Sequence, residues 1–453
     1  MKNIHTKSVL PGIIFLFISI NLFPQNYDES LLWEISDNGL TKPSYLYGTI
    51  HVQDKRVFEL HDSVVIAIEN CDAFAGELNM DSVYLQVMNY LAEIKYTGKS
   101  LEELLTKEEY EKLNKKSEKI LGLPLNEIPI KDPRIITIAL EDGELNEDFD
   151  FTLDEYLYRI AKYNKLKITS VETLEDQLNV LNSMTEEIIR ESLLKIINDE
   201  STDIEELIIA YSRNDLKLIN EMMTGWDEDF PELANVILYD RNIKMAEEIN
   251  NLVKRQTVFI AIGAGHLSGE RGVISLLAED GFKLRPVFSS NTEVSDKYSV
   301  ESMELLWQIY SPSTGEFEIE MPGTPFPIPF PVVDPDVKIE SGMCLDIAEK
   351  SVFIAIKYET LSDINEKADS ILQDILGWIT VNTDSLKIES IVSVDGSAGK
   401  QIQTEINGMN ALVNYYVVDK KILMFIASVP DDSAGKKNAE RFFRSFRLKK
   451  NNH

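Results

Sequence analysis

Apolar and polar positions alternate in a strand-then-helix pattern at the start of the chain. Residues 44–50 form a short apolar run typical of a buried strand, residues 58–70 carry apolar side chains at roughly helical spacing, and residues 72–78 form a second apolar run. A strand, a helix and a strand in so few residues predict a βαβ unit with parallel strands. In this interpretation the two strands are neighbours in the sheet.

Amphipathic stretches dominate the following two hundred residues. Thr152 and Glu155 form a plausible capping box before one of them. We expect helices over residues 82–96, 107–121, 153–163, 174–184, 186–198, 204–212, 216–223, 233–254 and 272–279, and strands over residues 166–171, 257–262 and 283–288. This pattern predicts an α/β fold over residues 27–290, in which a mostly parallel sheet carries a large helical cap.

The pattern changes near residue 290, which predicts a second domain over residues 305–450. Residues 291–304 are polar and are expected to form a linker, and the six prolines between positions 322 and 335 favour an extended loop rather than a central strand. Strands are expected over residues 352–358, 388–394, 400–406, 411–418 and 421–428, with a tight hairpin at Asp419-Lys420, and helices over residues 364–379 and 434–445. The result is a smaller α+β domain with an antiparallel sheet.

The N-terminal segment has the features of a secretory signal. Lys2 and Lys7 precede an apolar run over residues 9–23, which Pro11 and Gly12 interrupt and which is too short to span a bilayer stably. We expect residues 1–25 to be a signal peptide and the mature protein to be exported, either periplasmic or secreted, with no stable membrane span. The alternative is an uncleaved N-terminal anchor.

The amino-acid composition limits the classes of molecule that this protein is expected to bind. The 453 residues include 45 Lys and Arg against 76 Asp and Glu, a net charge of −31. This balance argues against a nucleic-acid partner, which requires a basic surface for phosphates, and it disfavours docking on anionic lipid. The two cysteines, Cys71 and Cys344, exclude a disulfide-rich scaffold, and whether they pair is open.

Two histidines occur in matching sequence contexts. Both His51, in Gly48-Thr49-Ile50-His51, and His266, in Gly263-Ala264-Gly265-His266, follow an apolar strand and precede a helical stretch. Ligand sites in parallel sheets lie just beyond the carboxyl ends of the strands, and both histidines are expected there. His61 falls within the first expected helix, and we interpret it as a surface residue.

Two glutamates are expected at the same edge, because Glu77 and Glu172 each close an apolar strand. Two neutral imidazoles and a carboxylate suit a divalent metal with an open position for water, so His51, Glu77 and His266 are candidate metal ligands. Such a metal would activate a water molecule, with Glu172 as its base. The alternatives are that the histidines belong to structural turns and that the glutamates cap helices.

Several of these motifs together resemble the TraB/GumN family, which includes the TIKI metalloproteases. The resemblance rests on residues 32–35, 44–51, 75–78, 170–178, 240–242 and 262–269, and it covers residues 31–288. It implies an α/β fold with a helical cap and a metal-dependent protease activity carried by both Gly-x-x-His motifs and a glutamate, with cobalt or manganese favoured. It also adds Arg241 and Asn242 to Glu172 as catalytic pocket residues. The end of the chain faintly resembles exported α+β domains of the PsbP kind.

Three hypotheses follow for function. The first is an exported metal-dependent hydrolase of the peptidase type, which holds manganese, cobalt or zinc and acts on a peptide or protein substrate. The second is a non-catalytic protein that binds a peptide or a haem-like ligand in the same pocket. The third is an interaction protein that depends on its second domain. The paired Gly-x-x-His motifs favour the first two, and the sequence leaves the substrate, the metal and the oligomeric state open.

We predict that the mature chain begins near Asn26 and lies outside the cytoplasm, because a Lys-flanked apolar run precedes this position and no cysteine follows it. N-terminal sequencing of the protein from fractionated cells measures this directly. Recovery of the chain with Met1 retained in the membrane fraction would contradict the prediction.

Overall fold

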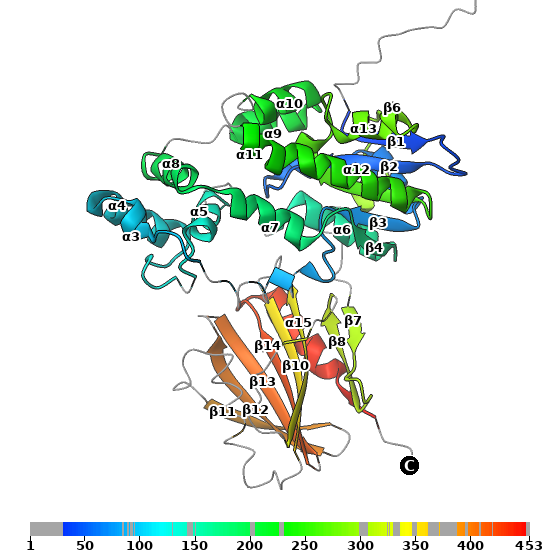
Figure 1. Cartoon of the computed structure of the whole chain (residues 1–453). Coiled ribbons are helices and arrows are strands. Elements are labelled where there is room, and N and C mark those ends of the chain that lie inside the picture. The colour runs from blue at the N-terminus through cyan, green and yellow to red at the C-terminus, as the bar shows by residue number, and fades with distance from the viewer. Residues whose placement is uncertain are drawn as a thin grey trace, which may run out of the picture.

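The structure is a computed structural model of the chain (Figure 1). It describes residues 30–449 apart from residues 84–85, 88–89, 91–93, 95, 129, 143–147, 150, 200–203, 226–230, 299–306, 324, 326, 329–335, 347–350, 361–370, 372–386, 395–396, 407–408 and 419. In that part of the chain, no helix is long and apolar enough to cross a membrane.

The first part of the chain is a mixed α/β structure around a six-stranded, mostly parallel sheet. The strand order is β4-β3-β5-β2-β1-β6, and β4, β3, β5 and β2 pair in parallel, whereas β1 pairs antiparallel with both β2 and β6. The strands are β1 (Leu32–Ser36), β2 (Ser44–Thr49), β3 (Ala73–Gly76), β4 (Lys167–Ser170), β5 (Val258–Gly263) and β6 (Lys283–Pro286).

One expected neighbour relation is wrong. The helix α1 (Asp62–Glu69) does join two parallel strands, β2 and β3, but β5 lies between them. The central strand β5 carries the continuous apolar run Val258–Ile262, which is buried throughout, as a strand covered on both faces requires. The sequence therefore identified the βαβ unit but not the strand inserted within it, because the pairing partner of β5 is distant along the chain.

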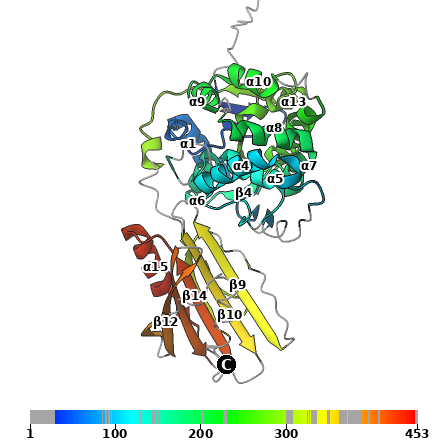
Figure 2. The same ribbon diagram turned by 90° about the vertical axis from the view of Figure 1, so that its left-hand side faces the viewer.

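Helices cover both faces of this sheet. On one face, α1 contacts β2 and α6 (Leu153–Tyr163), and α6 contacts β3, β4 and β5; on the other, α12 (Asp240–Val253) contacts β5 and α13 (Val273–Glu279), and α13 contacts β6. Figure 2 shows α1 and α6 on one side of β4 and α13 on the other. The bounds of α6 are those that the sequence predicted, and Thr152 and Glu155 form the expected capping box.

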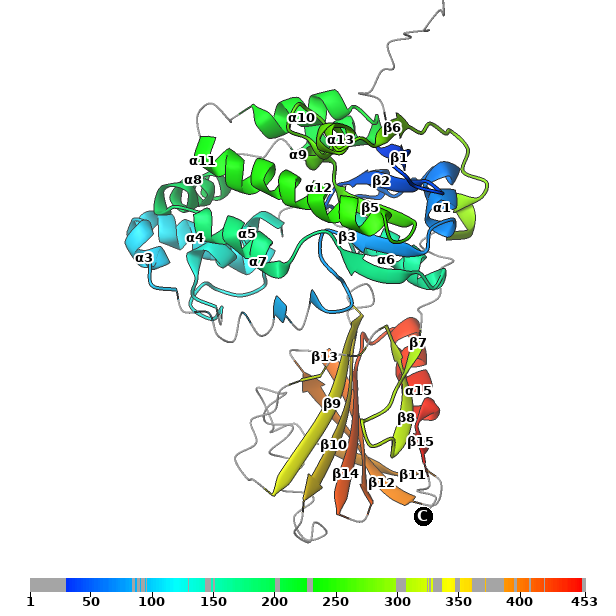
Figure 3. The ribbon, with the colours of Figure 1, turned by 45° about the vertical axis from the view of Figure 1, so that its right-hand side comes forward.

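A separate group of helices forms the cap, which lies to one side of the sheet in Figure 3. It consists of α3 (Leu101–Leu104), α4 (Lys107–Ile120), α5 (Pro133–Asp142) and α8 (Glu186–Ile197). These helices share a core of their own, with Leu113, Leu140, Ile189 and Leu193 fully buried. Neither α3 nor α5 was predicted from the sequence. Most of the helix expected over residues 82–96 lies outside the described residues.

The remaining helices connect the cap to the sheet. They are α7 (Leu174–Ser183), α9 (Ile204–Ser212), α10 (Leu216–Thr224) and α11 (Pro231–Ala234). The single helix expected over residues 233–254 is interrupted, because a π-helical turn, η3 (Asn235–Tyr239), separates α11 from α12. Such turns are rare and often occur at functional sites.

The expected linker begins as part of the first unit. Residues Ser295–Tyr298 form the 3₁₀ turn η5 against α1, where the buried Asp62 carboxylate accepts hydrogen bonds from the backbone amides of Val294 and Ser295 at 2.7 and 2.9 Å. Tyr298 is buried as well, so the described residues of this segment pack on the first part of the chain. That the two parts fold independently stays a prediction.

The second part of the chain contains two antiparallel sheets. One has six strands in the order β11-β12-β13-β14-β10-β9, and the other has three in the order β15-β8-β7. The strands are β7 (Trp307–Tyr310), β8 (Phe317–Pro322), β9 (Val337–Asp346), β10 (Ser351–Thr360), β11 (Lys387–Val394), β12 (Ser397–Ile406), β13 (Met409–Val418), β14 (Lys421–Ser428) and β15 (Arg447–Leu448), and the helix is α15 (Ser433–Ser445).

The pairing of Val418 with Lys421 confirms the hairpin between β13 and β14. Four strands of this part, β15, β7, β8 and β9, were not predicted, and β7, β8 and β9 lie around the proline-rich segment. The proline-rich segment obscured them, although β8 ends at its first proline, Pro322, and β9 begins after its last, Pro335. Almost all of the helix expected over residues 364–379 lies outside the described residues.

A buried lysine forms ion pairs that connect these two sheets. Lys357 of β10 is only 2% exposed, and its Nζ lies 3.0 Å from Glu316 Oε2 and 3.1 Å from Glu340 Oε2, with the Thr314 hydroxyl at 2.8 Å. Lys421 contacts the other oxygen of Glu316. Burial opposes ionisation of Glu316, but its bonds to Lys421, Thr314 and Lys357 lower its pKa to about 2.

Glu316→Gln is therefore expected to lower the free energy of unfolding by about 2 kcal/mol at pH 7, because a buried ammonium loses a charged partner. The ordinary pKa of this group is 4.5 and its folded pKa is about 2. Its contribution is thus complete above pH 4.5 and is lost as the pH falls toward 2. Urea titrations across this range measure the effect. The control, Glu440→Gln, breaks an exposed pair with Arg444 on α15 and is expected to change little. Equal effects of the two substitutions would contradict the prediction.

Candidate active site

Four predicted site residues follow the four parallel strands in order along one edge of the sheet. Glu172 follows β4, Glu77 follows β3, His266 follows β5 and His51 follows β2. The pairing of Thr49 with Gly263 in the β2–β5 ladder sets the two Gly-x-x-His motifs side by side. Parallel strands present their carboxyl ends on one side, so this edge is the expected location for a ligand site.

His266 is buried and held in one orientation. Its Nδ1 lies 2.6 Å from Asn242 Oδ1, while the amide nitrogen of Asn242 donates to the Arg271 carbonyl at 2.9 Å. Because the amide nitrogen donates to that carbonyl, Oδ1 is the acceptor, and the proton of His266 resides on Nδ1. Burial lowers the pKa of His266 to about 4, a shift that Arg241 reinforces and Glu77 opposes. The imidazole is therefore neutral, and its Nε2 makes no hydrogen bond to any described residue.

Arg241 joins the two glutamates. Its Nε and Nη2 donate to the two oxygens of Glu172 at 2.8 and 2.6 Å, and Nη2 also donates to Glu77 Oε2 at 2.9 Å. The side chain of Glu172 is completely buried. Burial raises the pKa of Glu172, although Arg241 opposes this rise. The pKa of Arg241 is also raised, because its interactions with the two carboxylates outweigh the effect of its burial. Two carboxylates thus face one guanidinium.

Glu77 accepts hydrogen bonds from two further groups besides Arg241. Its Oε1 accepts the backbone amide of Gly263 at 2.7 Å, and Gln177 of α7 donates to its Oε2 at 3.3 Å. A Cβ atom at position 263 would lie 3.2 Å from Glu77 Oε1 and 3.5 Å from His266 Cδ2, so Gly263 permits the close approach of both groups. Glu77 and His266 are therefore neighbours across this glycine.

His51 has different surroundings, because its side chain is 73% exposed. Its Nδ1 lies 3.4 Å from Asp154 Oδ2, and the other oxygen of Asp154 accepts a hydrogen bond from Thr49 at 2.6 Å. Asp154 was missed in the sequence, although it stands in the first turn of α6, within the capping box that was recognised. An oxygen atom thus faces Nδ1 in both Gly-x-x-His histidines, and metal-bound histidines usually have such an oxygen at the ring nitrogen that does not bind the metal.

The predicted site residues are only partly assembled. The structure brings Glu77, Glu172, Arg241, Asn242 and His266 into one connected network. Across the described ranges, however, no three His, Cys, Asp or Glu side chains are placed to hold a metal ion. Both oxygens of Glu77 are engaged, and the His51 ring contacts Asp154 rather than this network. As placed, these side chains do not form a three-ligand metal site.

The expectation that His61 is a surface residue is wrong. It directly precedes α1, its side chain is partly buried, and its Nδ1 is fully buried with no hydrogen-bond partner among the described residues. The helical pattern suggested an exposed position because it extended α1 too far toward the N-terminus.

The fold and this site define an α/β protein with a polar network at the carboxyl edge of a mostly parallel sheet, where two Gly-x-x-His motifs lie in neighbouring loops. The sequence profile of the TraB/PrgY/gumN family matches residues 31–286, and the chain belongs to this family.

Curated relatives of this chain carry protease names. It is 25% identical over 321 residues to "Metalloprotease TIKI1" of Danio rerio, a match that covers 58% of this chain and 64% of the relative. It is 23% identical over 314 residues to "Metalloprotease TIKI2" of the same species, covering 56% and 60%. The matches thus span less than two thirds of the length of these relatives.

A solved structure also aligns with part of the chain. The solution structure of cyanobacterial PsbP from Synechocystis sp. PCC 6803 is 15% identical and covers 32% of this chain and 95% of that chain. Its TM-score of 0.24 is too low to establish a shared fold.

We predict that ¹⁵N NMR of histidine-labelled protein will show His266 as the neutral Nδ1–H tautomer from pH 5 to 8, since its pKa is about 4. Asn242→Ala removes the acceptor of this proton and is expected to cost about 1–3 kcal/mol of stability. Because the folded pKa lies below the ordinary 6.5, His266 reduces stability progressively as the pH falls from 6.5 to about 4. Asn251→Ala, which replaces an exposed asparagine on the same helix, is the matched control and is expected to change little. An Nε2–H tautomer in the wild type would contradict the assignment.

Proposed function

We propose that this protein is an exported metal-dependent hydrolase of the peptidase type. His51, Glu77 and His266 are its proposed ligands for manganese, cobalt or zinc, and Glu172, Arg241 and Asn242 are its proposed catalytic pocket residues. A bound metal of this kind acts as a Lewis acid toward a substrate carbonyl. The relatives named metalloproteases support the activity, and the signal-like N-terminal segment supports export.

The single observation that carries the proposal is the state of His266. Metal binding by histidine requires a neutral ring with one nitrogen available, and the other nitrogen is usually held by an oxygen. His266 meets each condition: its proton is on Nδ1 facing Asn242, its pKa lies far below neutrality, and its Nε2 has no partner among the described residues. The two carboxylates of Glu77 and Glu172 share a single guanidinium, that of Arg241. The group therefore carries an excess of negative charge, which favours a cation nearby.

One observation favours the alternative, a non-catalytic protein that binds a peptide or a haem-like ligand. Both glutamates are already engaged by Arg241, and Glu77 also accepts hydrogen bonds from Gly263 and Gln177. A carboxylate whose oxygens already accept hydrogen bonds is a poorer metal ligand than one whose oxygens are free. In the hydrolase, Glu77 would leave Arg241 and bind the metal. In the alternative, Glu77 would stay paired with Arg241.

Calorimetry with Mn²⁺, Co²⁺ and Zn²⁺, beside a peptide-library cleavage assay, tests the proposal. The full mature chain is expected to bind at least one of these metals and to lose cleavage with a chelator. His266→Ala and Glu77→Gln are expected to abolish cleavage and to weaken metal binding by about 10-fold or more. His51→Ala is expected to have the same effect, although His51 is exposed.

The control substitution is Glu279→Gln, an exposed carboxylate at the end of α13, directly before the turn into β6. It is expected to change neither measurement. Metal binding by His51→Ala and His266→Ala proteins at wild-type affinity would refute the proposed ligands. Metal or haem binding without cleavage of any peptide would instead support the binding protein.

A further inference from the structure

Arg271 connects the second Gly-x-x-His motif to the π-helical turn η3. It lies in the short loop between the 3₁₀ turn η4 (Ala264–His266) and α13. Its guanidinium carbon lies 3.6 Å from the centre of the Tyr239 ring, and its Nη2 donates to Asn235 Oδ1 at 3.0 Å. Both partners belong to η3, so the side chain is attached to this turn at two points.

The backbone of Arg271 contacts the same helical segment further along. Its carbonyl accepts a hydrogen bond from the amide nitrogen of Asn242 at 2.9 Å, and Asn242 lies in α12, which directly follows η3. The oxygen of the same amide lies 2.6 Å from His266 Nδ1. The contacts therefore form a chain that runs from η3 through Arg271 and Asn242 to His266.

The loop that carries Arg271 contains two glycines, which restrict the backbone least of all residues. Gly269 adopts a φ of +92°, and Gly272 directly follows Arg271. A hydrogen bond from the Gly272 amide to the Gly269 carbonyl at 3.1 Å closes the turn, but it does not involve the carbonyl of Arg271. The contacts of the Arg271 side chain with η3 therefore anchor this loop to the helical segment that carries Asn242.

The carbonyl of Arg271 decides the orientation of the Asn242 amide. The oxygen and the nitrogen of an asparagine amide exchange places when the group turns over, so its neighbours determine which atom faces which side. A carbonyl only accepts, so Nδ2 faces Arg271, Oδ1 faces His266, and the ring proton lies on Nδ1. Without that carbonyl, the amide is free to turn over. Nδ2 would then donate to an unprotonated Nδ1, and the ring proton would lie on Nε2.

We propose that Arg271 is a positioning residue that sets the tautomer of His266 by holding the Asn242 amide in one orientation. It acts from the surface, because Arg271 is exposed whereas Asn242 and His266 are buried. The tautomer determines which ring nitrogen keeps its lone pair, and with the proton on Nδ1 this is Nε2. The benefit for metal binding rests on the proposed function, since Nε2 is the nitrogen that would bind the metal. The effect on the tautomer does not rest on it.

Histidine ¹⁵N NMR of the full mature chain, in a chelating buffer at neutral pH, tests this inference. The signals of His266 are those that are absent from a His266→Gln protein. Arg271→Ala removes both contacts with η3 and is expected to raise the ratio of the Nε2–H to the Nδ1–H tautomer by about 5-fold or more, the equivalent of one lost hydrogen bond. Tyr239→Leu removes the ring on the other side of the contact and is expected to shift the ratio in the same direction.

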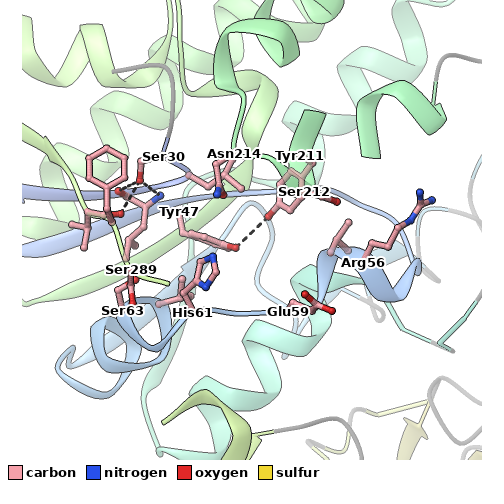
Figure 4. A pocket seen from close by; sticks show the side chains of 16 residues that line it. Ser30, Tyr47, Arg56, Glu59, His61, Ser63, Tyr211, Ser212, Asn214 and Ser289 are labelled. Carbon is pink, nitrogen blue, oxygen red and sulfur yellow. Dashed lines mark hydrogen bonds between the residues drawn. The ribbon is translucent and has the colours of Figure 1, made fainter. Parts of the chain in front are cut away.

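The matched control is Arg213→Ala, which replaces another exposed arginine, directly after α9. Arg213 stands between Ser212 and Asn214, which line the cavity shown in Figure 4, and none of the proposed site residues lines that cavity. This substitution is expected to leave the tautomer of His266 unchanged.

The inference is overturned if Arg271→Ala and Tyr239→Leu have the tautomer ratio of the wild type, if Arg213→Ala shifts the ratio as much, or if the wild type is already the Nε2–H form. The protein is metal-free in this measurement, so the result is independent of the proposed activity. A shifted tautomer in Arg271→Ala, with no metal binding by the wild type, would support this inference and contradict the proposed function. Metal binding by the wild type with an unchanged tautomer in Arg271→Ala would do the reverse.

Discussion

The buried guanidinium of Arg241 is the interaction on which the candidate site depends. It connects Glu172 after β4 with Glu77 after β3, and so it fixes two loops that are almost a hundred residues apart in the sequence. A buried carboxylate such as that of Glu172 is tolerated only when it is paired, and removing one partner of such a pair costs about 3–5 kcal/mol. Arg241 is therefore needed for the architecture of the site, whatever chemistry occurs there.

The glycines of the two Gly-x-x-His motifs impose a second constraint. A side chain at Gly48 would lie 2.6 Å from Leu267 Cδ1 and 3.1 Å from the Ala264 side chain, so the first motif packs directly on the second. Gly263 allows Glu77 and His266 to approach from the other side. The spacing of each motif thus reflects backbone packing between neighbouring loops as much as the position of its histidine.

The sequence predicted the mostly parallel sheet, and the four strand-end residues proposed for the site do follow its parallel strands at one edge. Periodicity is local information, and it located β2, β5 and α6 within one residue at each end. It did not place β5 between β2 and β3, because strand order depends on contacts between distant segments. Nor did it reveal that Arg241 engages both glutamates, or that Asp154 faces His51, since an Arg on a helix and an Asp in a helical first turn are ordinary surface features.

The contrast between the two histidines bears on how the site works. His266 is buried, neutral and fixed by Asn242, whereas His51 is exposed and contacts Asp154. A fixed ligand contributes affinity because little conformational entropy is lost when it binds, while an exposed side chain must be ordered at a cost. In this arrangement His266 and Glu77 form the rigid half of the site. In the proposed site, the exposed side chain of His51 is the half that a bound metal would have to order.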